Sequence, residues 1–216
     1  MATPSMSMNK VIHCAVRRDL SRFRAALESF QDGDRARAAG LHRAWENFDD
    51  QLTHHHEGEH EIAWPALLAV GVGQDTIDRF DDEHEAMASA LAESRTAMGA
   101  LAGSASRADA DSAASSLAKL EEVTVTHLDA EEQVTEPLFA EHHDHPVVKE
   151  MGRKFGKQPL GVAGTFFAWV QDGAGPAEMT ALRDEVPAPV VTLLPLLFGR
   201  RYRKEIAPVW ATSGSH

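Results

Sequence analysis

The chain has 216 residues, and its 21 Lys and Arg against 33 Asp and Glu give a net charge of −12 at pH 7. This length is enough for one large domain, or for a medium-sized domain with an extension, that buries a core of its own. The acidic balance excludes nucleic acid as the main partner, because phosphate binding needs a basic face. A single cysteine, Cys14, excludes an internal disulfide and any metal site built from several thiolates, and it makes the cytoplasm the simplest location.

Charge and proline content divide the chain near residue 145. Residues 1–145 carry a net charge of −15, whereas residues 146–216 carry +3 and seven of the ten prolines. We therefore predict an acidic helical domain over residues 10–145 and a proline-punctuated helical extension over residues 146–216. No apolar stretch is long enough to cross a bilayer, so we expect no transmembrane segment.

Four segments of the first 145 residues repeat apolar residues at alternating steps of three and four, as on the inward face of a bundle helix. Breaks rich in Gly, Ser and Asp near residues 31–34, 71–75 and 103–112 separate the segments. Four such helices with short connections predict an all-α, up-down-up-down four-helix bundle. The apolar stripes run from His13 to Phe30, Leu41 to Ile62, Ile77 to Leu101 and Leu117 to Leu138.

Polar residues interrupt these stripes in a pattern that occurs twice. Burying an imidazole or a carboxylate without a partner costs several kcal/mol, so their presence on an inward face requires a reason. Each half of the domain has one lone His and one His-x3-Glu-x5-Pro string, and corresponding members are 71 or 72 residues apart. The members are His13, His55, Glu59 and Pro65 in the first half, and His84, His127, Glu131 and Pro137 in the second.

This repeat predicts a metal site in the middle of the bundle. Two residues four apart on a helix lie on successive turns of one face, so the lone His residues and the His-Glu pairs can meet at one level of the core. Imidazole and carboxylate suit Fe, Mn or Zn, and the absence of sulfur disfavours a structural zinc site. Six ligands exceed what one tetrahedral zinc uses, so we expect two metals bridged by Glu59 and Glu131 with imidazoles as terminal ligands.

The order of these motifs resembles the hemerythrin-like, HHE cation-binding family. The resemblance rests on His13, HHHEGEH at 54–60 with WPAL at 64–67, EH at 83–84, and HLDAEE at 127–132 with EPLF at 136–139. It implies a carboxylate-bridged pair of non-heme irons in a four-helix bundle. By resemblance the ligands are His13, His55, Glu59, His84, His127 and Glu131, and His56 is a further ligand because the corresponding position binds metal in some relatives.

Two departures from the oxygen-carrying hemerythrins affect the expected function. Those proteins have a His pair one turn apart on the third helix, whereas Ala88 stands four residues after His84 here, and they end with His-x4-Asp where this chain has His127 and Glu131. Simple oxygen carriage is therefore less favoured than reaction with O2, peroxide or nitric oxide, as in a catalase, a peroxidase or a nitric-oxide-handling enzyme. The alternatives are an iron store or a sensor of iron, oxygen or nitric oxide without turnover, and a metal-free interaction bundle.

The remaining polar clusters and the extension support weaker expectations. We expect His54 and His60 to be solvated or to contact ligands, and the acidic residues 81–85 and 129–132 to form a mostly solvated face. The helices of the extension add core over the bundle, form a homodimer interface, or make a lid over the metals. A membrane-surface role would fit FGRRYRK at 198–204, but it needs a sustained amphipathic helix, against which the three prolines in 187–195 argue.

Overall fold

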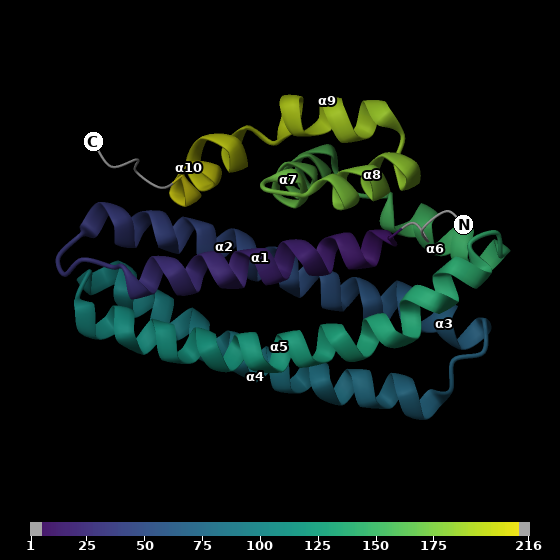
Figure 1. Ribbon diagram of the computed structural model, residues 1–216, viewed down its shortest axis with the longest axis horizontal. Coiled ribbons are helices and arrows are strands. Elements are labelled where there is room, and N and C mark those ends of the chain that lie inside the picture. Colours follow the sequence, from purple (N-terminus) through teal and green to yellow (C-terminus); the bar gives the residue numbers. More distant parts are fainter. Residues whose placement is uncertain (1–5, 212–216) are drawn as a thin grey trace.

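The computed structural model describes residues 6–211, and all regular secondary structure in that range is helical. Four long helices run along the long axis of the molecule, and shorter helices cover one side and one end of them (Figure 1). The elements are α1 (Met8–Glu28), α2 (Arg35–Gly58), the π-turn η1 (Glu59–Ala63), α3 (Trp64–Ala69), α4 (Gln74–Ser104), α5 (Arg107–His142), α6 (Pro146–Phe155), α7 (Leu160–Gln171), α8 (Pro176–Glu185), α9 (Ala188–Phe198), the π-turn η2 (Tyr202–Ile206) and α10 (Ala207–Trp210).

The long helices α1, α2, α4 and α5 form the predicted bundle. Helix α5 packs along α4 and α1, and α2 packs along α4, so that short connections join antiparallel neighbours. Most residues of the predicted stripes are buried, with Phe23, Leu41, Phe80 and Leu120 fully inside the core. The prediction of an all-α bundle with additional C-terminal helices is confirmed.

Local signals in the sequence determine where these helices begin. The side chains of Ser7, Asp34 and Ser106 accept hydrogen bonds from the backbone N–H groups three residues later, which caps α1, α2 and α5. The expected break over 103–112 is shorter than predicted, because only residues 105 and 106 lie outside helices. The polar residues that follow form the capped first turns of α5 instead of a loop.

Helix α2 widens into the π-turn η1 just before Pro65. The Trp64 N–H bonds to the Glu59 carbonyl five residues earlier, and Pro65 has no N–H with which to continue an ordinary α-helical ladder. Because this turn contains one residue more than an α-helical turn, the residue that faces the core comes one position later in the sequence. Ala63 is therefore buried and Ile62 only half-buried, whereas the stripe predicted Ile62 at the inward position.

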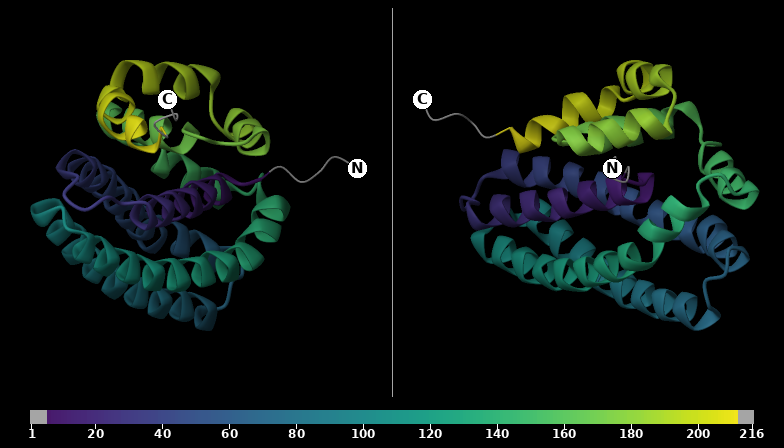
Figure 2. Two further views of the ribbon diagram at one scale, coloured as in Figure 1. Left: turned by 60° about the vertical axis from the view of Figure 1, so that its left-hand side comes forward. Right: turned by 45° about the vertical axis from the view of Figure 1, so that its right-hand side comes forward.

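Helices α7 to α10 lie over α1 and α2 as a second layer (Figure 2), while α6 packs on η1 and α3. Helices α7 and α8 pack on α1, while η2 and α10 pack on α2. Phe167, Trp169, Leu182, Tyr202 and Ile206 are buried and belong to the same apolar cluster as the bundle core. The extension thus adds core to the bundle.

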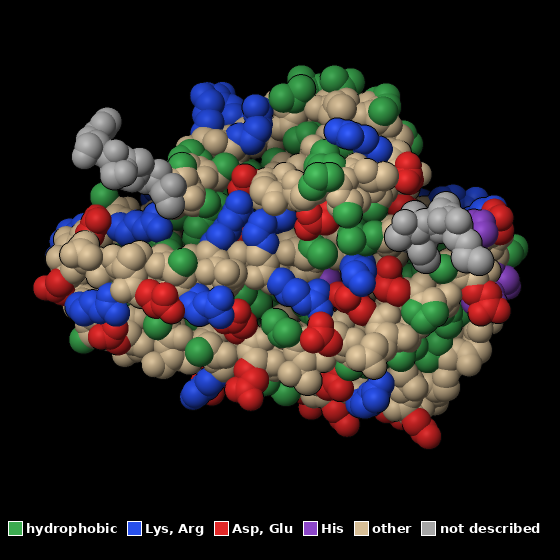
Figure 3. Space-filling view, in the orientation of Figure 1, with side chains coloured by type: hydrophobic (Ala, Val, Ile, Leu, Met, Phe, Trp, Pro, Cys, Tyr) green, Lys and Arg blue, Asp and Glu red, His purple; other side chains and the backbone are tan. Residues whose placement is uncertain are grey.

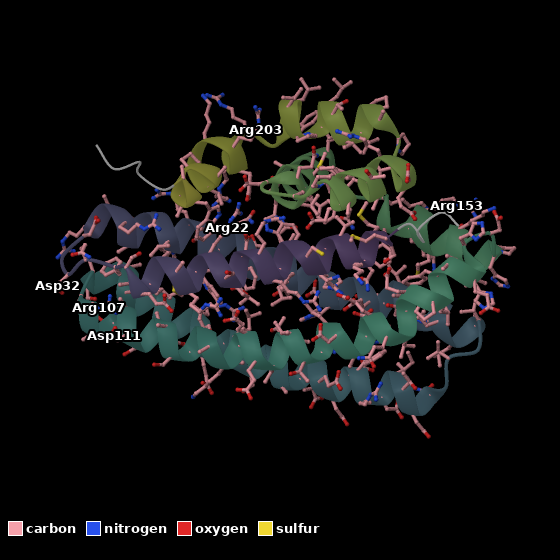
Figure 4. All side chains as sticks on the ribbon, viewed as in Figure 1. Arg22, Asp32, Arg107, Asp111, Arg153 and Arg203 are labelled. Carbon is pink, nitrogen blue, oxygen red and sulfur yellow. The ribbon has the colours of Figure 1, made fainter. Side chains whose placement is uncertain are left out.

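Polar side chains connect the second layer to α1. The Trp169 indole N–H donates to the buried Asp19 carboxylate at 2.8 Å, and Arg22 donates to both Asp19 and Asp172, between the two layers (Figure 4). The Tyr202 hydroxyl donates to Asp172 at 3.0 Å. Burial raises the pKa of Asp19, although its contacts with Trp169 and arginines oppose that shift. Each group in this buried network therefore has a partner, which orients the extension on the bundle.

The prolines of 187–195 are accommodated at the start of α9 and inside it, and α9 ends at Phe198, so a single helix does not continue through FGRRYRK at 198–204. Pro187 precedes α9 as its N-cap and Pro189 lies in its first turn, where a missing N–H costs nothing. Pro195 lies inside the helix and is buried. No helix among the described residues is both long and apolar enough to span a bilayer.

Gly164 permits the close contact between α7 and α9, which gives a test of the second layer. A Cβ at this position would meet the Phe198 Cβ and lie 2.9 Å from the Leu194 carbonyl oxygen. We expect Gly164→Ala to lower the free energy of unfolding by about 1–3 kcal/mol through overpacking, as measured by urea denaturation followed by circular dichroism.

Gly161→Ala is the matched control on the same helix, because a Cβ there would meet nothing within 4 Å. Its higher helix propensity should leave stability unchanged or raise it by up to about 1 kcal/mol. Equal stability of the two variants would contradict the close packing of α7 against α9.

Candidate metal centre

The bundle brings the predicted ligands together from all four of its helices. His13 comes from α1, His84 from α4, and His127 and Glu131 from α5. His55 and His56 lie in the last turn of α2, and Glu59 begins η1. His13, Glu59, His127 and Glu131 are at most 2% exposed, so the centre lies inside the core.

Each half of the sequence repeat contributes one close pair of imidazoles. The Nε2 atoms of His13 and His55 are 3.1 Å apart, and those of His84 and His127 are 3.0 Å apart. The Nδ1 atoms of two of these rings contact carboxylates, which explains why their Nε2 atoms face the centre. His13 Nδ1 lies 3.0 Å from Glu132, and His127 Nδ1 lies 2.8 Å from Glu83. An Nδ1–H that donates to a carboxylate leaves the Nε2 lone pair pointing into the centre.

The potential ligands form two groups that share one residue. His13, His55, Glu59 and Glu131 form the first group, and His56, Glu59 and His84 form the second, each with its ligand atoms within 4.8 Å of one another. Glu59 belongs to both because its Oε1 lies 3.1 Å from His55 Nε2 and its Oε2 lies 3.4 Å from His84 Nε2. The His56 ring stacks on His84 with centroids 4.3 Å apart.

The two carboxylates differ in their surroundings. Glu131 Oε1 accepts a hydrogen bond from Asn9 Nδ2 at 2.9 Å, and its Oε2 lies 3.1 Å from His13 Nε2. No described side chain donates to either oxygen of Glu59. Glu59 and Glu131 occupy equivalent positions in the sequence repeat. In the structure, Asn9 donates a hydrogen bond to Glu131, whereas no described side chain donates to Glu59.

Several buried polar atoms of the centre have no hydrogen-bond partner among the described residues. These atoms are both oxygens of Glu59, Oε2 of Glu131 and Nε2 of His56. Leaving buried polar atoms unpaired is costly, and a group of them converging from different helices is rare in a folded core. Imidazole nitrogens and carboxylate oxygens are the donor set that Fe, Mn and Zn accept, so the residues fit a bound divalent metal.

Burial and neighbouring like charges shift the pKa values of the centre in the direction of the neutral forms. Burial, and next the charge of Glu131, raise the pKa of Glu59 well above its usual value. Burial lowers the pKa of His55 and His56 well below the usual range, and neighbouring imidazoles lower it further. Burial likewise lowers the pKa of His84 to about 4. Neutral imidazoles are the form in which His binds metals.

Glu132 and Glu83 contact the predicted ligands His13 and His127, although the sequence pattern assigned them to a solvated face. Glu132 also accepts from Arg17 at 2.6 Å, and its side chain is only 13% exposed. Partial burial by itself would raise the pKa of Glu132, but His13 and Arg17 lower it to about 2. Each of these carboxylates directly neighbours a ligand in sequence. That adjacency is the one signal that could have identified them.

The flanking histidines lie outside the centre. His54 is exposed and its Nδ1 lies 2.7 Å from the Asp50 carbonyl oxygen, while His60 is exposed beside Asp81. Neither belongs to the two groups of potential ligands. Apolar rings close the centre instead, since Trp64 stacks on His84 and Phe80 meets His127 edge to face.

Replacing the carboxylates behind the imidazoles tests this arrangement. We expect Glu132→Gln and Glu83→Gln each to weaken Fe²⁺ binding by about 10–100-fold, because the Nδ1 contact would no longer hold His13 or His127 in its metal-binding orientation. Competition with a chelator under anaerobic conditions measures the affinity. Glu85→Gln, at an exposed position beside His84, is the control and should leave the affinity unchanged. Equal affinities for all three variants would contradict the proposed role of these carboxylates.

Comparison with known proteins places the chain in a family. The model of the hemerythrin HHE cation binding domain matches residues 10–139, which is more than half of the chain and includes every residue of the two ligand groups. Comparison with curated proteins and with solved structures gives no significant match. With its helical bundle and the His and Glu cluster in its core, the chain belongs to the hemerythrin family of HHE cation-binding domains.

Proposed function

We propose that this protein binds two non-heme iron ions in its bundle and that they react with small ligands such as O2, peroxide or nitric oxide. The observation that carries the proposal is the position of Glu59 in both ligand groups. A carboxylate with two free oxygens between two sets of imidazoles can bind one ion with each oxygen, and its negative charge reduces the repulsion between the two cations.

The proposed ligand sets follow the two groups. His13, His55 and Glu131 would bind the first ion together with one oxygen of Glu59, and His56 and His84 would bind the second together with the other oxygen. The second set would also include His127, whose Nε2 lies 3.0 Å from that of His84. These sets contain all seven residues expected from the sequence.

Only one of the two glutamates is suited to bridging in this proposal. Asn9 holds Glu131 Oε1, and Glu131 belongs to the first ligand group alone. We therefore assign the bridge to Glu59 and a terminal position to Glu131 Oε2, in place of the two equal bridges expected from the repeat.

Bound iron would supply redox chemistry and a coordination position for a small ligand. The chain itself would hold the imidazoles in place through Glu132 and Glu83, and Trp64 and Phe80 would exclude bulk water from the ligands. Ala88 stands one helical turn after His84, where oxygen carriers have a further His. The missing imidazole leaves more open coordination, which favours reaction with the ligand over simple carriage.

Iron analysis tests the metal content. Protein purified with iron should contain about two irons per chain and show near-ultraviolet absorption from a bridged ferric pair. Glu59→Gln should lose both ions, whereas Glu131→Gln should keep about one, because only Glu59 contributes to both ligand sets. Glu57→Gln, at an exposed position on the same turn, is the control. One zinc per chain, or full iron content in Glu59→Gln, would contradict the proposal.

Reaction with hydrogen peroxide distinguishes an enzyme from the alternative, a sensor or iron store without turnover. If the protein is a catalase, the iron-loaded chain should release O2 from hydrogen peroxide, which an oxygen electrode measures, and Glu59→Gln should be inactive. If neither O2 release, peroxide-dependent oxidation of an electron donor nor consumption of nitric oxide occurs in the loaded chain, turnover is excluded. The alternative would then be a sensor or iron store that uses the same ligands.

A further inference from the structure

An apolar ridge on the second layer has no partner in the structure. Leu193, Leu196 and Leu197 are 51–67% exposed, and Phe198 is 40% exposed. The three leucines lie at positions i, i+3 and i+4 of α9, so they project from one face of the helix. The opposite side of α9 carries the buried Val191 and Pro195 and packs against α7. Phe198 lies on that packed side, with its Cβ against Gly164 of α7. We call the three exposed leucine side chains the α9 ridge.

Four cationic side chains follow shortly after the α9 ridge in the sequence. Arg200, Arg201, Arg203 and Lys204 are all exposed, and Figure 3 shows Lys and Arg side chains beside the hydrophobic side chains over α9. Arg203 projects at this end of the helix (Figure 4) and donates to the Leu196 carbonyl. Of the four, only Arg201 lies within ion-pair distance of a described carboxylate. We call these four residues the cationic segment.

The charges discriminate between possible occupants of this surface. An occupant has to offer an apolar surface and, next to it, negative charge for the cationic segment. A second copy that pairs α9 antiparallel would offer residues 183–185, whose net charge is only −1, against +3 for residues 200–205. The acidic residues of the chain are concentrated in the bundle, on the other side of the second layer (Figure 3).

We propose that the α9 ridge and the cationic segment dock on the surface of a bilayer that contains anionic lipids. The leucine side chains enter the boundary between headgroups and acyl chains, and the Arg and Lys side chains contact the anionic headgroups. Helix α9 lies parallel to the membrane, and the acidic bundle points away from it. The prolines lie at the start of α9 or on its buried side, so they leave the apolar face continuous.

Vesicle co-sedimentation of the full, iron-loaded chain tests this proposal. The chain should bind vesicles of phosphatidylcholine and phosphatidylglycerol in equal parts, bind vesicles of phosphatidylcholine alone much more weakly, and be released by high salt. Leu193→Ser with Leu197→Ser, and Arg200→Glu with Lys204→Glu, should each weaken binding by at least about tenfold. Arg35→Glu with Lys119→Glu, at exposed positions of the bundle, makes the same change in net charge and should bind nearly as the wild type does.

Iron content and circular dichroism show whether each variant keeps its fold, since all the substituted side chains are exposed. No binding to the anionic vesicles at low salt would overturn the proposal, as would binding that neither the ridge variant nor the charge variant weakens. A dimer in light scattering that Leu193→Ser with Leu197→Ser dissociates would also overturn it, because the ridge would then be an interface between copies.

Discussion

The structure depends on a buried carboxylate, Glu59, that has no hydrogen-bond partner among the described residues. Without a cation its burial is costly, and burial together with the charge of Glu131 raises the pKa of Glu59. The imidazoles around it come from different helices, so a shared cation would link the helices as well as neutralise the charge. The buried carboxylate with no described hydrogen-bond partner therefore lies where the proposed metals would hold the helices together.

The second layer depends on a different kind of buried polar group. Asp19 is paired with Trp169 and Arg22, and the network continues to Asp172 and Tyr202. A buried network in which the polar groups are satisfied fixes the orientation of packed elements, whereas an unsatisfied one marks a site for a ligand. The same bundle thus has a polar network that orients a layer and a polar cluster that fits a metal.

Much of the bundle and of its centre could be predicted from the sequence. The residues that were predicted wrongly each have a physical explanation. Helical periodicity and the repeat of lone His and His-x3-Glu identified the inward residues, because both follow from the 3.6-residue period of one helix. Ile62 was misplaced because a π-turn before Pro65 shifts the inward face by one residue. Glu132 and Glu83 were missed because they contact imidazoles on other helices, and helical periodicity contains no information on such contacts.

The sequence by itself determined the four bundle helices, the inward position of the predicted ligands and the family, since these depend on spacing along the chain. Only the tertiary structure decided which residues contact one another between helices. It separated the two glutamates that the repeat treats as equal, because Asn9 of α1 reaches Glu131 and no described donor reaches Glu59. It also decided which face of α9 is exposed, because the packing of α9 against α7 is a property of the folded chain.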